Sequence, residues 1–198
     1  AIVVDGKATG ASDVKFGMLT SGLSESKLDS TNYYNFTIWN GTESVDVKVE
    51  KNSTKWGKFD KKTFIAYTEV GADANGVMEI EIEENYTDQQ LTNKAEVKGV
   101  TDAVAVASYD AKNKSVSFTG IAGTKEYDLS DDVVIIGVNT EDKKGVAGVE
   151  LDVADETSKS GVYFKNAVFF MDGDEVIAIF VDSKGAMYSD HKLTTEDK

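Results

Sequence analysis

The sequence contains no cysteine, no proline and no arginine, so all 21 basic residues are lysines. Without cysteine the chain has no disulfide bond, no thiolate nucleophile and no cysteine-ligated metal site. Without arginine it lacks the side chain that binds phosphate and carboxylate groups through two parallel hydrogen bonds. These absences exclude the disulfide-rich and cysteine-dependent protein classes.

Catalytic motifs are also missing. The single histidine, His191, lies in a polar stretch near the C-terminus, where a solvated side chain is expected rather than a general base. There is no Gly-x-Ser-x-Gly, phosphate-binding loop or His-Glu-x-x-His sequence. Glu79, Glu81 and Glu83 alternate along a predicted strand on its solvent face, without the apolar cleft that a catalytic carboxyl group needs. We therefore expect that the chain is not an enzyme. Two carboxyl groups facing each other across a cleft would be the exception.

The net charge is −14, from 35 acidic and 21 basic residues. Such a surface repels nucleic acid and anionic membranes. No apolar run approaches the roughly 18 residues that cross a bilayer, so no membrane insertion is expected. Residues 1–6 lack the basic and apolar segments of a signal peptide and are typical of the middle of a strand. We therefore expect a longer chain whose export signal lies upstream.

Apolar and polar residues alternate with period two along most of the chain, in segments bounded by Gly, Asn, Asp and Ser, which is typical of β-strands. Asn40-Gly41 and Asp73-Ala74-Asn75-Gly76 are suited to tight hairpin turns. Helical turns are expected only at residues 22–29 and 149–157. Strands are predicted at residues 35–39, 44–50, 63–70, 77–82, 104–109, 115–119, 126–129, 133–138, 162–171 and 176–182.

The two halves of the sequence are similar, which indicates a duplicated unit. Three blocks occur in the same order in both: residues 41–47 with 123–129, Phe59 and Phe64 with Phe164 and Phe169, and residues 77–82 with 176–181. Together these patterns predict an all-β protein of two similar small β-barrel or β-sandwich units in tandem, with little helix. The first domain is expected to span residues 1–95 and the second residues 96–198. The junction has no proline and no Gly/Ser run, so we expect the two units to be held in a fixed relation.

Calcium is the one ion that the sequence suggests. Among the oxygen-rich turns, Asp172-Gly173-Asp174 is the best candidate, with Asp172 and Asp174 as ligands. The twelve-residue calcium-binding loop is not complete in this chain, and Asp is also what hairpin geometry favours without a metal. Both interpretations stay open.

Trp39 and Trp56 are candidates for an aromatic platform on which a sugar ring stacks. Alternation places Trp39 on the opposite face of its strand from Ile38, so its ring is expected outside the core of its own unit. The alternative is that the ring covers the rim of a barrel.

Two segments of the second half carry a resemblance to a known family. Asp128-Leu129-Ser130-Asp131-Asp132-Val133-Val134-Ile135 and the strand–turn–strand segment at residues 166–179 resemble the tandem β-repeats of Gram-positive S-layer-type surface proteins. Such proteins carry S-layer homology modules elsewhere that anchor them to the cell wall, and no such module is visible in this sequence. The resemblance includes no catalytic motif.

The resemblance implies a non-catalytic structural or spacer region of a secreted cell-envelope protein, at the cell surface or in the cell wall. Its partners would be other copies of the chain or other envelope components, with divalent cations bridging acidic faces. The alternative is a carbohydrate- or protein-binding module of a secreted surface protein.

Overall fold

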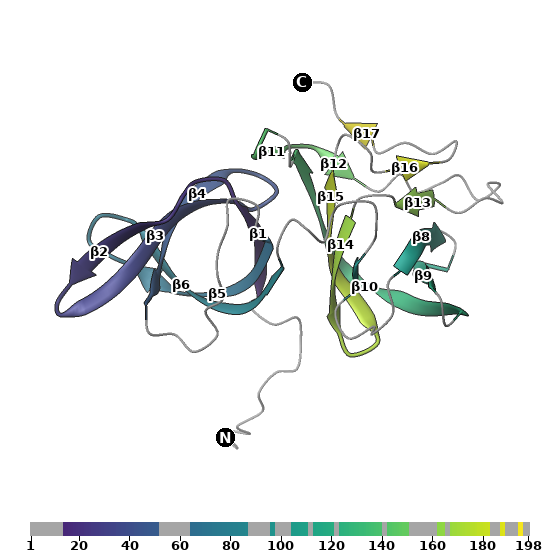
Figure 1. Cartoon of the computed structure of the whole chain (residues 1–198), viewed down its shortest axis with the longest axis horizontal. Helices are drawn as coiled ribbons and strands as arrows, with labels where there is room; N and C mark the ends of the chain where they lie inside the picture. The colour runs from purple at the N-terminus through teal and green to yellow at the C-terminus, as the bar shows by residue number, and fades with distance from the viewer. Residues whose placement is uncertain are drawn as a thin grey trace, which may run out of the picture.

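The computed structural model describes residues 14–51, 64–86, 96–97, 104–110, 113–120, 123–139, 142–150, 162–164, 167–182, 187–188 and 194–195. Within these ranges the chain consists of β-strands and the turns between them, with no helix. The N-terminal strands form a closed barrel, and the C-terminal strands form a half-barrel beside it (Figure 1). The predicted fold class, two similar β units in tandem, is confirmed.

The first unit is one six-stranded sheet in the order β1-β5-β6-β4-β3-β2. Antiparallel pairing of β1 with β3 closes five of these strands into a barrel, and β2 extends outward from β3. The strands are β1 (Lys15–Leu19), β2 (Ser24–Leu28), β3 (Thr31–Trp39), β4 (Ser44–Glu50), β5 (Phe64–Ala72) and β6 (Met78–Tyr86).

Both hairpin turns predicted in this unit are present. Between β3 and β4, Gly41 has φ of 100°, a conformation that glycine adopts without steric cost. The Asn40 side chain accepts hydrogen bonds from the backbone N–H groups of Thr42 and Glu43, at 2.9 Å each. The second turn, between β5 and β6, contains Gly76 at φ of 81°.

The helical turn expected at residues 22–29 is wrong, because Ser24–Leu28 is strand β2. Asp29 and Ser30 both have positive φ, 45° and 75°, as a two-residue type I′ hairpin turn requires. Pairing with β3 thus overrides the weak local preference of the polar residues in β2. In the other expected helical segment, Val149–Glu150 is strand β12, and residues 151–157 lie outside the described residues.

The barrel interior is a closed apolar core formed by alternate residues of its strands. In β3, Phe36 and Ile38 point inward, and in β6 Ile80 and Ile82 do the same while Glu81 is exposed. The buried members of this core are Leu19, Phe36, Ile38, Val47, Val49, Ile65, Tyr67, Ile80 and Ile82.

The second unit contains a nine-stranded sheet, in which β16-β13-β8-β9-β10-β15-β14-β7 are neighbours and β11 pairs with β10. Strand β12 pairs separately with β17 (Thr194–Thr195). The strands of the main sheet are β7 (Glu96–Val97), β8 (Val104–Asp110), β9 (Ser115–Gly120), β10 (Gly123–Asn139), β11 (Lys144–Val146), β13 (Val162–Phe164), β14 (Ala167–Asp172), β15 (Glu175–Asp182) and β16 (Met187–Tyr188).

The two units share a pattern of strand pairing. Three antiparallel pairs of the first unit, β2–β3, β3–β4 and β5–β6, have counterparts in β8–β9, β9–β10 and β14–β15. In both units, the second and third pairs are joined by a parallel contact, β4 with β6 and β10 with β15. The matched sequence blocks lie mostly in these corresponding strands. Residues 41–43 lie in the β3–β4 turn although their matches 123–125 belong to β10, Phe164 belongs to β13, and Phe59 lies outside the described residues.

The units differ at one edge. In the first unit β1 is antiparallel to β5 and also pairs with β3, which closes the barrel. The strand at the same place in the second unit, β7, runs parallel to β14. The strands of the first sheet end at Tyr86 and those of the second begin at Glu96. The expected boundary between residues 95 and 96 adjoins a stretch, 87–95, outside the described residues.

A second apolar core lies between the two units. From the barrel it takes the outward side chains of β1 and β5, such as Phe16, Phe64 and Ala66, and from the half-barrel those of β10, β14 and β15. The Phe64 and Phe180 rings meet edge to face with centroids 4.9 Å apart, and Phe16 and Phe170 meet at 5.3 Å. The buried members of this inter-unit core are Phe16, Met18, Trp39, Phe64, Ala66, Ile136, Val138, Val168, Phe170, Ala178 and Phe180.

Candidate functional site

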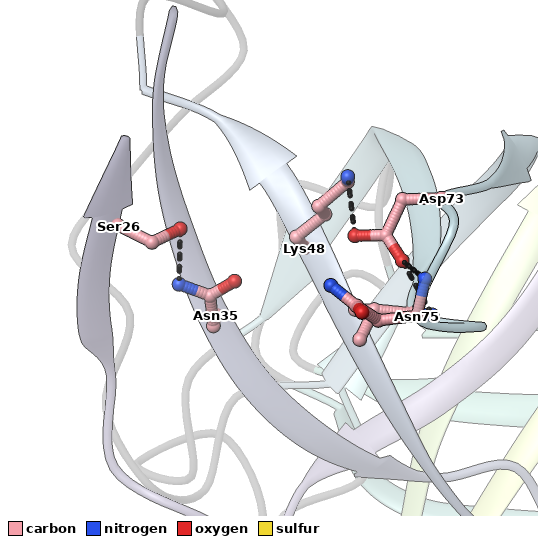
Figure 2. A network of polar contacts seen from close by, with 6 residues as sticks. Ser26, Asn35, Lys48, Asp73 and Asn75 are labelled. Atoms are coloured by element: carbon pink, nitrogen blue, oxygen red, sulfur yellow. Dashed lines mark hydrogen bonds and ion pairs between the residues drawn. The ribbon is translucent and has the colours of Figure 1, made fainter. Parts of the chain in front are cut away.

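A connected polar group on the barrel is the ion pair of Lys48, in β4, with Asp73, in the β5–β6 turn. Lys48 Nζ lies 2.9 Å from Asp73 Oδ2, and their side chains are only 5% and 17% exposed. Figure 2 shows the ammonium and the carboxylate facing each other. The Lys48 ammonium also lies 4.9 Å from the centroid of the Tyr33 ring, a cation–π contact.

Asp73 organises the turn that brings it to Lys48. Its Oδ1 accepts hydrogen bonds from the backbone N–H groups of Asn75, at 2.8 Å, and Val77, at 3.0 Å. The hydrogen bond from Lys48, followed by the backbone bond from Val77, lowers the pKa of the Asp73 carboxyl group below 3.8. All of these bonds favour the charged carboxylate, so the group is an anchor for the hairpin rather than a proton donor or acceptor.

A second polar group lies on the neighbouring β2–β3 hairpin. The Asn35 side chain donates to Ser26 Oγ at 2.8 Å on one face of the hairpin, as Figure 2 shows. Lys51 pairs with Glu25 at 2.6 Å and lies over the Tyr34 ring. The bond to Glu25 raises the pKa of Lys51. These contacts fix the orientation of the hairpin side chains.

Trp39 lies in the inter-unit core. Its indole is on the opposite face of β3 from Ile38, as the alternation predicts, but it is only 9% exposed. Its Nε1 donates a hydrogen bond of 3.1 Å to the carbonyl oxygen of Gly137 in β10. Gly145, in β11, lies so close to the ring that any Cβ at this position would overlap the indole.

A sugar ring stacks only on an exposed aromatic face, and the buried Trp39 ring does not offer one. Trp56 lies outside the described residues, so its part in a platform stays a prediction.

Asp172 is the last residue of β14, and Asp174 lies in the exposed turn to β15, next to Gly173 at φ of 59°. Across the ranges that the structure describes, no three His, Cys, Asp or Glu side chains gather as a metal ligand set. Calcium binding by these two aspartates stays a prediction.

Sequence reasoning missed two contacts between distant segments, Lys48 with Asp73 and Trp39 with Gly145. One signal was present for the first. Asp at the start of a four-residue hairpin accepts hydrogen bonds from turn N–H groups through one oxygen, which leaves the other oxygen for a side chain of the neighbouring strand in the sheet. The second contact joins segments about 100 residues apart and carries no local signal.

No helix in the described residues is long and apolar enough to cross a membrane. Comparison with known proteins finds no matching family model, no similar curated protein and no similar solved structure.

Proposed function

We propose that the chain is a non-catalytic structural segment of a secreted cell-envelope protein, in which two β units act as one rigid spacer. The observation that carries this proposal is the inter-unit core. A spacer must transmit position and force from one end to the other, and it does so only if its units do not rotate freely against each other.

The composition of the core supports rigidity. Phe16 and Phe64 of the barrel interlock with Phe170 and Phe180 of the half-barrel, all at most 6% exposed. Burial of each phenylalanine side chain contributes about 1.5–3 kcal/mol. Separation of the units would expose all four rings, so the separated state is strongly disfavoured.

Two further properties fit this role. The shared order of strand pairing supports an origin of both units from one ancestral unit, with an interface between neighbouring units as in repeat proteins. The net charge of −14 keeps such a surface soluble and attracts divalent cations. The resemblance to S-layer-type proteins points to the cell surface as the location.

Calorimetry and two optical probes test the rigidity. We expect one unfolding transition, with far-ultraviolet circular dichroism and tryptophan fluorescence changing together. Two separate transitions would overturn the rigid-spacer proposal. Antibodies against the chain should label the outside of intact producing cells, and labelling only after lysis would contradict the surface location.

The calcium part of the proposal has its own test. If Asp172 and Asp174 bind calcium, millimolar calcium should raise the melting temperature relative to EDTA. The double variant Asp172→Ala, Asp174→Ala should lose that rise. An unchanged melting temperature in the parent chain would remove cation bridging at this turn from the proposal.

For the alternative function, a carbohydrate- or protein-binding module, the position of Trp39 bears only on sugar stacking at this ring, which is covered by Gly145.

A further inference from the structure

Strand β2 is an exposed sheet edge. In the part of the chain that the structure describes, β2 pairs only with β3, and all five of its residues are exposed. The β2–β3 hairpin extends away from the barrel on the side opposite the half-barrel (Figure 1). Leu28, at the end of the strand, is 46% exposed, and Leu23, directly before it, is 38% exposed. These are two of the four exposed large hydrophobic residues of the described chain.

The direction of the backbone groups in β2 follows from the hydrogen bonds of β3. The Asn32 carbonyl accepts from Lys51 N–H at 2.8 Å, so the backbone of Asn32 points toward the β4 side. Its neighbours Thr31 and Tyr33 therefore point their backbone groups toward β2, where they face Leu28 and Ser26. It follows that Glu25 and Lys27 direct their backbone N–H and C=O groups away from β3, toward the free edge.

The side chains at this edge are self-complementary in charge. If a second β2 is placed antiparallel to the first with Ser26 opposite Ser26, Glu25 of each copy lies opposite Lys27 of the other. The outward backbone groups of Glu25 and Lys27 then form four hydrogen bonds across the pair. Placement of the symmetry axis at Glu25 or Lys27 instead sets like charges opposite each other, which is destabilising.

We propose that β2 is a self-association edge, at which two copies of the chain pair antiparallel about a twofold axis through Ser26. Glu25 is held by Lys51 at 2.6 Å, on the same face as Lys27. In the pair, Glu25 also faces Lys27 of the other copy. Leu28 lies opposite Ser24 of the other copy, which covers part of its exposed surface.

The contact is small, so the association is weak. A five-residue strand buries far less than the roughly 1,000 Å² of a stable interface, and the high net charge of each copy opposes approach. The equilibrium is expected at high local concentration and at about 0.15 M salt, where the Debye length is about 8 Å and long-range repulsion is screened. This inference is independent of the proposed function, since it concerns an edge that would pair in any cellular setting.

Disulfide trapping tests the register, and the chain has no cysteine of its own. Residues opposite each other in a non-hydrogen-bonded pair have Cα atoms about 4.5 Å apart, within the range that a disulfide bridges. Ser26→Cys should therefore oxidise to a dimer at least about tenfold faster than the matched control Ser24→Cys, whose two copies would be roughly 14 Å apart. Equal rates for the two variants would overturn the proposed register.

Charge exchange tests the pairing itself by sedimentation. Glu25→Lys and Lys27→Glu should each lose the concentration-dependent association of the parent chain, because each sets like charges opposite each other. Mixed in equal amounts, they should form a heterodimer, since every pair is then again Lys with Glu. Lys114→Glu, on the second unit, reproduces the net-charge change of Lys27→Glu and should leave association unchanged. A parent chain that stays monomeric up to millimolar concentration, or a mixture that does not associate, would overturn the proposal.

Discussion

The indole nitrogen of Trp39 donates a hydrogen bond to the carbonyl oxygen of Gly137, 98 residues further along the chain. This bond joins the end of β3 in the barrel to β10 in the half-barrel, inside a core that contains Phe16 and Phe170. One side chain thus ties together the two units through both packing and a polar contact.

Replacement of Trp39 should destabilise the whole chain. Trp39→Ala should lower the free energy of unfolding by about 3–5 kcal/mol, because it leaves a cavity between the units. Trp39→Phe should cost less, about 1–3 kcal/mol, mostly from the Gly137 carbonyl left without its donor. Urea unfolding followed by circular dichroism measures both. Val70→Ala, at a position 58% exposed, is the control and should change the value by less than about 0.5 kcal/mol.

Gly145→Ala should be destabilising because the added methyl group overlaps the Trp39 ring. The expected loss is about 1–3 kcal/mol, the usual cost of overpacking a filled core. In the Trp39→Ala background the same change should cost much less, since the ring is gone. Equal losses in both backgrounds would mean that Gly145 is needed for its backbone conformation and not for its closeness to the indole.

The Asp73 carboxyl group should titrate below 3.8, because Lys48 and the turn N–H groups favour its charged form. A depressed folded-state pKa means that this group stabilises the fold above about pH 4. That contribution is lost as the pH falls through the folded-state pKa. A carbon-detected NMR titration of Asp73 measures the midpoint, which should rise in Lys48→Met. A midpoint that stays the same in the variant would show that the turn N–H groups alone set it.

Tyr67 should resist ionisation, since burial in the barrel interior and the nearby Glu69 raise its pKa to about 12. Because the pKa is about 12 in the folded state and 10 in the unfolded state, ionisation of Tyr67 does not affect the free energy of unfolding below pH 10. The free energy of unfolding then falls as the pH rises from 10 toward 12. The loss is up to about 2–3 kcal/mol. Tyr67→Phe should therefore remain folded to higher pH than the parent chain in an alkaline unfolding experiment. Earlier unfolding of the variant would indicate that the hydroxyl group has a stabilising partner.

Ser30→Gly should stabilise the β2–β3 hairpin. Ser30 has φ of 75°, in the left-handed region that costs an L-residue about 1–2 kcal/mol, and the entropy of glycine offsets part of this. The net rise in the free energy of unfolding should be about 0.5–1 kcal/mol. The matched change Thr31→Gly, one residue later within β3, should be destabilising instead.

Local signals in the sequence were sufficient to predict β4, β5, β6, the end of β3 and the two tight turns that connect them, whereas β1 (Lys15–Leu19) was not predicted. Asn40-Gly41 marks a hairpin by its backbone requirements, and the alternation of β4 identifies its buried face. Strand β2 was missed because Ser24–Leu28 has no β-branched or aromatic residue, and its pairing with β3 decides its conformation.

The inter-unit core was only partly predictable. Alternation placed Trp39 on the outer face of β3, but it does not say that another unit covers that face. A signal was nevertheless present in β15, where Ala178, Ile179, Phe180 and Val181 are all buried. A continuous apolar run indicates a strand covered on both faces, in contrast to β6, where glutamates alternate with isoleucines. Contacts between distant segments, such as Trp39 with Gly145, cannot be predicted from the local pattern of apolar and polar residues.

The shared core has a consequence for how such a chain changes during evolution. In a string of independent repeats, a copy is added or deleted without harm to its neighbours. Here the outer surface of the barrel at Phe16 and Phe64 is shaped to the half-barrel, and a recombination event at the junction would leave that apolar surface facing water. The pair of units, rather than either one alone, is therefore the smallest segment that recombination can move intact.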